Sequence, residues 1–90
     1  LEVLLVSADG VASRHRVGSD LAAGQRPQLA IAGGTFHAGL VAPGGAFGYA
    51  LLGTSVWGRV DPERVQRMDL GALGEVFPAA LPVIKAFDSV

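Results

Sequence analysis

Glycine and proline interrupt this chain so often that they limit the length of every regular element. The sequence has 13 glycines and 5 prolines among 90 residues, and the apolar segments between them are short. Turn-forming pairs stand at Asp9-Gly10, Gly33-Gly34 and Gly44-Gly45. Turns spaced by about eight to twelve residues favour an all-β sandwich or barrel over alternating strands and helices.

The strands expected from this pattern begin at the first residue. Leu1–Val6 is a run of β-favouring residues, and Asp9-Gly10 indicates a hairpin that returns along Val11–Val17. Polar residues alternate along this return strand, as expected where one face is exposed. The further strands expected are Gln28–Ala32, Thr35–Ala42 and Ala46–Trp57, the last bent or bulged at Gly48 and Gly53.

The pattern changes after Trp57. Asp61-Pro62-Glu63 combines a helix N-cap, a proline at the first helical position and an acidic first turn. Asp69 is placed to cap a second short helix through Phe77, and helical spacing then relates Phe77, Leu81, Ile84 and Phe87. We therefore expect one domain over residues 1–90, with a β body over 1–57 and a helical tail over 61–88 on its outside.

Composition restricts the partners. Seven Lys and Arg against eight Asp and Glu give a net charge of −1, far from the basic balance of a nucleic-acid binder. No apolar run approaches the ~20 residues that cross a bilayer, and the start lacks the features of a signal peptide. We therefore expect a cytoplasmic protein with no nucleic-acid or membrane partner. The apolar fraction of 50% is high for a short chain, which predicts either a very dry interior or burial of apolar surface against another chain, so we expect an oligomer.

The segment Gly18–Val56 resembles the cupin superfamily, and most closely cupin family 5, a branch of small uncharacterised single-domain proteins. The likeness rests on the phrase DLAAGQRPQ at 20–28, on Pro43-Gly44-Gly45 before a strand with Tyr49-Ala50-Leu51, and on the tail Asp69–Pro78. The resemblance implies an all-β double-stranded β-helix, which is a jelly-roll barrel that usually dimerises, here with short C-terminal helices.

The cupin motifs are matched in part. Gly34 and His37 stand at two positions of the second motif, whereas Ala32 and Val41 replace its proline and asparagine. The first motif, with two histidines and a carboxylate, would lie N-terminal to Leu1. The resemblance therefore implies a partial barrel that begins in the middle of the fold.

His37 is the leading candidate for chemistry. A neutral imidazole facing the barrel interior suits a general base or a ligand of Fe, Mn, Ni or Zn, so a divalent transition metal is the cofactor considered. The competing interpretation is a barrel histidine hydrogen-bonded to backbone or water. Ser13 with His15 offers a nucleophile and a base, but no G-x-S-x-G motif supports hydrolysis.

Other candidates for ligand binding accompany His37. Arg26 and Gln28 precede an expected strand, and an arginine there suits two-pronged binding of a carboxylate or phosphate. Tyr49 and Trp57 suit the wall of a ligand cavity. For Arg26 and Gln28, structural hydrogen bonds are the favoured alternative. For Tyr49 and Trp57, it is packing in the core or at an interface.

Two functions remain open at this stage. The first is a cupin-like protein that binds a small molecule in its barrel. If it is an enzyme, the resemblance points towards sugar isomerase or epimerase chemistry, or towards metal-dependent oxygenation. The second is a non-catalytic dimerisation domain with a vestigial pocket. The residues do not decide whether the chain is an enzyme.

Overall fold

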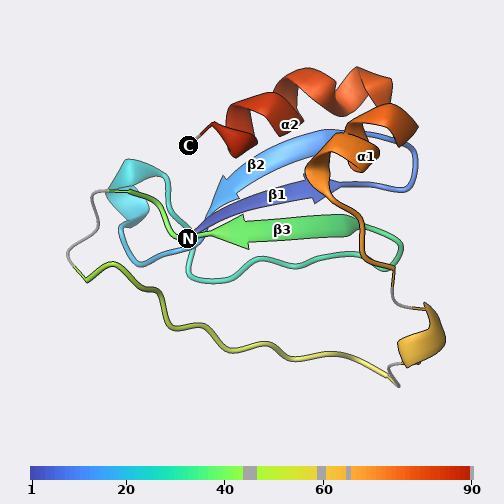
Figure 1. Ribbon diagram of the computed structural model, residues 1–90. Helices are drawn as coiled ribbons and strands as arrows, with labels where there is room; N and C mark the ends of the chain where they lie inside the picture. Colours follow the sequence, from blue (N-terminus) through green and yellow to red (C-terminus); the bar gives the residue numbers. More distant parts are fainter. Residues whose placement is uncertain (44–46, 59–60, 65, 90) are drawn as a thin grey trace.

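The computed structural model describes residues 1–43, 47–58, 61–64 and 66–89. This part of the chain forms an antiparallel sheet of three strands in the order β2-β1-β3, with helices packed on one face (Figure 1). The strands are β1 (Glu2–Val6), β2 (Ala12–Arg16) and β3 (Phe36–Leu40), and the helices are α1 (Leu70–Val76) and α2 (Leu81–Asp88). Short 3-10 turns are η1 (Leu21–Ala23), η2 (Pro62–Arg64) and η3 (Pro78–Ala80).

The hairpin predicted at Asp9-Gly10 is confirmed. β1 and β2 pair antiparallel, with Val6 opposite Ala12 and Glu2 opposite Arg16. Gly10 has a φ of 86°, a left-handed conformation that favours glycine, and its N–H donates to the Ser7 carbonyl at 2.9 Å. The Ser7 hydroxyl donates to the Asp9 carboxylate, which lowers the pKa of Asp9. Local turn chemistry therefore sets the register of this pair.

β1 lies between its two neighbours because its sequence is apolar on both faces. Antiparallel pairing with β3 places Val6 opposite Phe36 and Glu2 opposite Leu40. Leu4 and Val6 are 1% and 0% exposed, and Val3 is also buried. A strand that is buried on both faces shows no alternation of polar and apolar residues. After Glu2, the residues of β1 are all apolar and follow this pattern.

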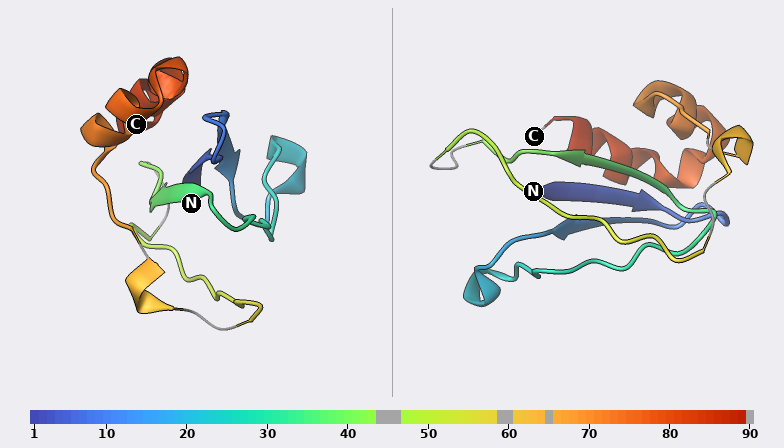
Figure 2. Two further views of the ribbon diagram at one scale, coloured as in Figure 1. Left: turned by 90° about the vertical axis from the view of Figure 1, so that its right-hand side faces the viewer. Right: turned by 90° about the horizontal axis from the view of Figure 1, so that it is seen from below.

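One face of the sheet packs against α1 and α2 (Figures 1 and 2). Alternation along β1 directs Leu4 and Val6 to this face, where they form the core with four residues of the C-terminal segment. These are Leu73, Ala80, Ile84 and Phe87. The predicted cap of α1 is confirmed, since the Asp69 side chain accepts a hydrogen bond of 2.7 Å from the Ala72 N–H.

The predicted jelly-roll barrel is wrong. Such a barrel needs a second sheet, whereas in the described residues a layer of helices covers the apolar face of a single open sheet. The strand expected at Gln28–Ala32 does not form, and residues 47–57 of the strand expected at Ala46–Trp57 are irregular. Leu73 of α1 and Ile84 and Phe87 of α2 form the apolar layer that a second sheet would have provided.

One further expectation differs from the structure, and another falls on residues that the structure does not describe. The helical tail was expected outside the β body, but its apolar residues make up most of the core beside β1. The expected turn at Gly44-Gly45 lies outside the described residues. Among the described helices, none is long and apolar enough to cross a membrane.

Residues 47–58, here called the extended segment, stand away from the packed core. They run below the sheet in Figure 1, on the side opposite the helices. Every residue of the segment is exposed and none belongs to a strand or helix. Its apolar side chains therefore contribute nothing to the core of a single chain.

Ile84→Ala tests whether α2 is part of the core. Ile84 is 2% exposed against the sheet, so truncation should lower the free energy of unfolding by about 2–5 kcal/mol. Urea denaturation followed by circular dichroism measures this change. The exposed neighbour Lys85→Ala should change stability by less than about 0.5 kcal/mol. Equal, small effects of both variants would contradict the packing of α2 on the sheet.

Candidate functional site

Charged side chains gather at the start of β1 and the end of β2. Glu2 is 3% exposed, and alternation places it on the helix-facing side of the sheet with Arg14 and Arg16. Arg16 Nε donates to Glu2 Oε1 at 2.6 Å, and Arg14 lies 3.5 Å from Oε2. The buried carboxylate is therefore matched by two arginines whose side chains are 32% and 62% exposed.

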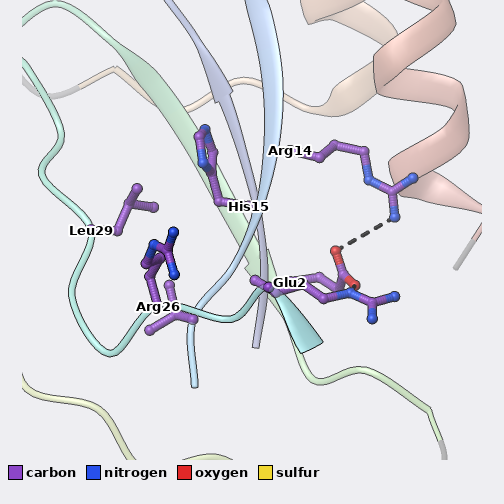
Figure 3. Close-up of a pocket in the computed structure, with 8 residues that line it drawn as sticks. Glu2, Arg14, His15, Arg26 and Leu29 are labelled. Carbon is purple, nitrogen blue, oxygen red and sulfur yellow. Dashed lines mark hydrogen bonds and ion pairs between the residues drawn. The ribbon is translucent and has the colours of Figure 1, made fainter. Parts of the chain in front are cut away.

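The other side of β2 presents a different set of groups. Figure 3 shows His15, Arg26 and Leu29 on one side of this strand, and Arg14 and Glu2 on the other. These residues line a cavity of about 400 Å³ together with Arg16, Val17 and Gly24. The cavity therefore extends around the β2 edge of the sheet.

The backbone of Arg26 is fixed against the end of β2. Its N–H donates to the Arg16 carbonyl at 3.0 Å, and its carbonyl accepts from the Gly18 N–H at 2.8 Å. A parallel bridge joins Arg26 to Val17, so their side chains share the face of the sheet that lies away from the helices. The turn η1 stabilises this return, because the Asp20 side chain caps it through the Ala23 N–H.

The residues that line this cavity carry a net positive charge, although the net charge of the whole chain is negative. Three arginines against one glutamate give the lining a charge of +2 with His15 neutral, whereas the whole chain has −1. The rest of the chain therefore carries −3. Such a separation of charge attracts anions to this edge of the sheet.

Ser13 and His15 form the one side-chain pair here with the elements of nucleophilic catalysis. Ser13 Oγ lies 2.8 Å from His15 Nε2, since residues two apart on a strand share a face. Within the described residues, no carboxylate hydrogen-bonds to His15 to orient it. A serine and histidine without an orienting group or an oxyanion hole do not make a triad.

His37 does not face a barrel interior. It is exposed on β3 and lines a separate groove of about 680 Å³ at the β3 edge. Apolar side chains, among them Phe36, Leu70 and Leu73, line the groove together with Gln66 and Arg67. The imidazole is therefore accessible to a ligand, but from an open groove and not from an enclosed cavity.

The residues near His37 do not fit a transition-metal site. No group of three His, Cys, Asp or Glu in the described part of the chain is arranged to hold a metal ion. The charged neighbour in the groove is Arg67, whose guanidinium repels a cation. We therefore derive no chemistry through a metal, and ligation by His37 stays a prediction.

The other predicted site residues are scattered. Arg26 lines the cavity at β2, whereas Gln28, Tyr49 and Trp57 line neither cavity. Tyr49 and Trp57 are 69% and 97% exposed. Arg14, His15 and Arg16 line the same cavity but were not among the predicted binding residues. The signal that points to them is the alternation of Ser13, His15 and Val17 with Arg14 and Arg16, which places a basic residue on each face of one strand.

Comparison with known proteins yields no relative. No protein-family model, curated protein or solved structure matches the chain significantly. The resemblance to the cupin superfamily therefore stays a prediction, and the geometry of the chain is the basis for a proposed function.

Arg16→Met tests the ion pair at the start of β1. The change keeps the apolar stem but leaves the buried Glu2 carboxylate with Arg14 alone, at 3.5 Å. We expect a loss of about 1–2 kcal/mol in the free energy of unfolding, reduced from the cost in a buried pair because Arg16 is 62% exposed.

Arg26→Met is the matched control, since it removes the same charge at a residue without a carboxylate partner among those described. Chemical denaturation at low salt should show a change below about 0.5 kcal/mol for this control. Equal losses in the two variants would show that pairing with Glu2 does not stabilise the fold.

Proposed function

We propose that this chain is an assembly domain that forms a homodimer through its extended segment, residues 47–58. The observation that supports this most strongly is the exposure of apolar side chains there. Leu51 and Trp57 are 95% and 97% exposed, although both belong to residue types that are normally buried or half-buried.

The exposed apolar side chains are concentrated in this segment. Among the described residues, half of the strongly exposed large apolar side chains lie within it. They are Phe47, Tyr49, Leu51, Leu52, Val56 and Trp57. The rings of Phe47 and Tyr49 lie 5.8 Å apart, so part of the surface is already a packed aromatic pair. Aromatic residues are the side chains most enriched in the centre of protein interfaces.

The solvent-accessible surface area of the chain supports burial against a partner. Its accessible surface is 6973 Å², whereas a folded monomer of 9.2 kDa exposes about 4,900 Å². The excess of about 2,000 Å² is more than the ~800 Å² that each partner buries in a standard interface. The surplus is therefore large enough to hold a standard interface with a partner.

A second copy of the same chain is the partner that these features favour. A net charge of −1 gives little repulsion between copies, and most oligomers of soluble proteins are symmetric homo-oligomers. The β3 edge, Phe36–Leu40, has no charged side chain and is suited to pairing with another strand. The β2 edge has Arg14 near its centre, which opposes symmetric pairing there because like charges would meet.

Replacement of Leu51 and Trp57 by serine tests this function. Sedimentation equilibrium of the unchanged chain should give twice the 9.2 kDa mass, and the double variant should associate at least about 100-fold more weakly. Val11→Ser with Val76→Ser is the matched control, since both residues are exposed apolar positions outside the segment. A monomeric unchanged chain at about 100 μM would refute the proposal.

Trp57 also provides a direct signal of assembly. It is the single tryptophan of the chain, so its emission should shift to shorter wavelength as concentration rises and the ring leaves water. Emission that is independent of concentration while the mass doubles would place the interface away from Trp57.

A second candidate function is the binding of a small molecule, as the resemblance to cupin family 5 implies. The observation in its favour is that His37 lines an open groove that combines apolar side chains with three other polar ones, those of Thr35, Gln66 and Arg67. Sugar isomerase or epimerase chemistry is the activity this resemblance points towards. Cytoplasmic localisation accompanies both candidates as a prediction.

His37→Ala distinguishes this second function from assembly. Titration with a panel of free and phosphorylated monosaccharides should shift amide resonances of residues 34–38 in the unchanged chain, and His37→Ala should abolish the shifts without changing the mass of the oligomer. Lys85→Ala, at an exposed residue that lines neither cavity, is the control. Absence of shifts in the unchanged chain would remove the support for this candidate.

A further inference from the structure

We propose that the cavity at the β2 edge binds a small organic anion, either a carboxylate or a phosphate monoester attached to a short apolar body. This site is separate from the extended segment, so it does not depend on the assembly proposed above. The position of Arg26, the groups that lie beside it and the charge of the cavity support this site.

Arg26 provides the anion-binding group. Its side chain is exposed and, among the described residues, has no carboxylate partner. Its backbone is held on both sides by hydrogen bonds of 3.0 and 2.8 Å to Arg16 and Gly18. A planar guanidinium on a fixed backbone loses less freedom on binding than one on a mobile loop, and its fork of donors matches carboxylate and phosphate oxygens.

His15 contributes a second donor on the same side of β2. Figure 3 shows its ring and the Arg26 guanidinium on the side away from Arg14. Ser13 Oγ lies 2.8 Å from Nε2, so this contact occupies one ring nitrogen of His15 and leaves Nδ1 for a ligand. In the tautomer that accepts the hydroxyl proton at Nε2, Nδ1–H donates to a ligand oxygen. One imidazole and one guanidinium on the same side of the strand are then available to a single anion (Figure 3).

The remaining arginines act through their field and not by contact. Arg14 and Arg16 lie on the helix-facing side, where Glu2 accepts from both. One carboxylate does not neutralise two guanidinium groups, so this cluster adds a net positive charge beside the cavity. The field concentrates anions at the edge, while Arg26 and His15 make the direct contacts.

Apolar side chains define the rest of the ligand. Leu29 and Val17 are half-buried and line the cavity beside Arg26. A volume of about 400 Å³ is larger than inorganic phosphate needs and is at the lower end of small-molecule sites. The shape and chemistry therefore fit an anion with an apolar group of modest size. A nucleic acid is a poor fit, because the chain outside this lining carries −3.

Isothermal titration with phenyl phosphate, benzoate and inorganic phosphate tests this site. Arg26→Gln should weaken binding of phenyl phosphate by at least about tenfold, as expected for loss of a charge-assisted hydrogen bond. Lys85→Gln is the matched control, because it removes one positive charge at an exposed position outside the cavity lining. It should change the affinity by less than about twofold.

Leu29→Ala separates the two parts of the ligand. It should weaken phenyl phosphate while leaving inorganic phosphate unchanged, since it removes apolar contact only. Comparison of phenyl phosphate with benzoate then distinguishes the phosphate from the carboxylate class. Amide spectra of each variant establish that the fold is retained, which the exposed position of Arg26 favours.

The outcomes are decisive in both directions. Saturable binding that is lost in Arg26→Gln, kept in Lys85→Gln and partly restored in Arg26→Lys supports the proposal. No saturable heat with any of the three probes overturns it, and so does equal weakening by Arg26→Gln and Lys85→Gln, because general charge attraction then explains the binding. Sedimentation of the same samples keeps this result separate from the test of assembly.

Discussion

The packing of Leu4 and Val6 of β1 against Ile84 and Phe87 of α2 is the contact on which the rest of the structure depends. These residues are at most 2% exposed and join the two ends of the chain in one core. With a core this small, most of the hydrophobic stabilisation comes from this one layer. The layer closes one face of the sheet, and it leaves the extended segment and both sheet edges available for other contacts.

The strands that border this core also determine the positions of the charged side chains of Glu2, Arg14 and Arg16. Alternation along β1 places Glu2 on the same face as Leu4, so its carboxylate is buried beside the helices and needs a cationic partner. Arg14 and Arg16 provide the charge, because the hairpin register sets them on the same face of β2. The alternate residue His15 then lies on the opposite face with Ser13. The proposed anion site therefore follows from the register of one hairpin.

Local chemistry explains which predictions from the sequence succeeded. The Asp9-Gly10 turn and the Asp69 cap act over a few residues, so the hairpin and the start of α1 were predicted correctly. The strands at Gln28–Ala32 and in the extended segment were wrong because a strand forms only where a neighbour accepts its hydrogen bonds. Of the predicted site residues, Arg26 and His37 line cavities, but different ones. The number of residues between Arg26 and His37 did not predict how far apart they lie in the folded chain.

The sequence by itself determined the local elements: short strands between glycine turns, a capped helix after Asp69, and an apolar content that is high for a chain of this size. Only the tertiary structure decided that helices and not a second sheet cover β1, because apolar side chains from either can fill the same volume. It also decided that Arg26 returns to the end of β2, through backbone hydrogen bonds to Arg16 and Gly18 that no side-chain pattern encodes. Binding sites made from segments distant in sequence depend on such contacts, and so they appear only when the chain is folded.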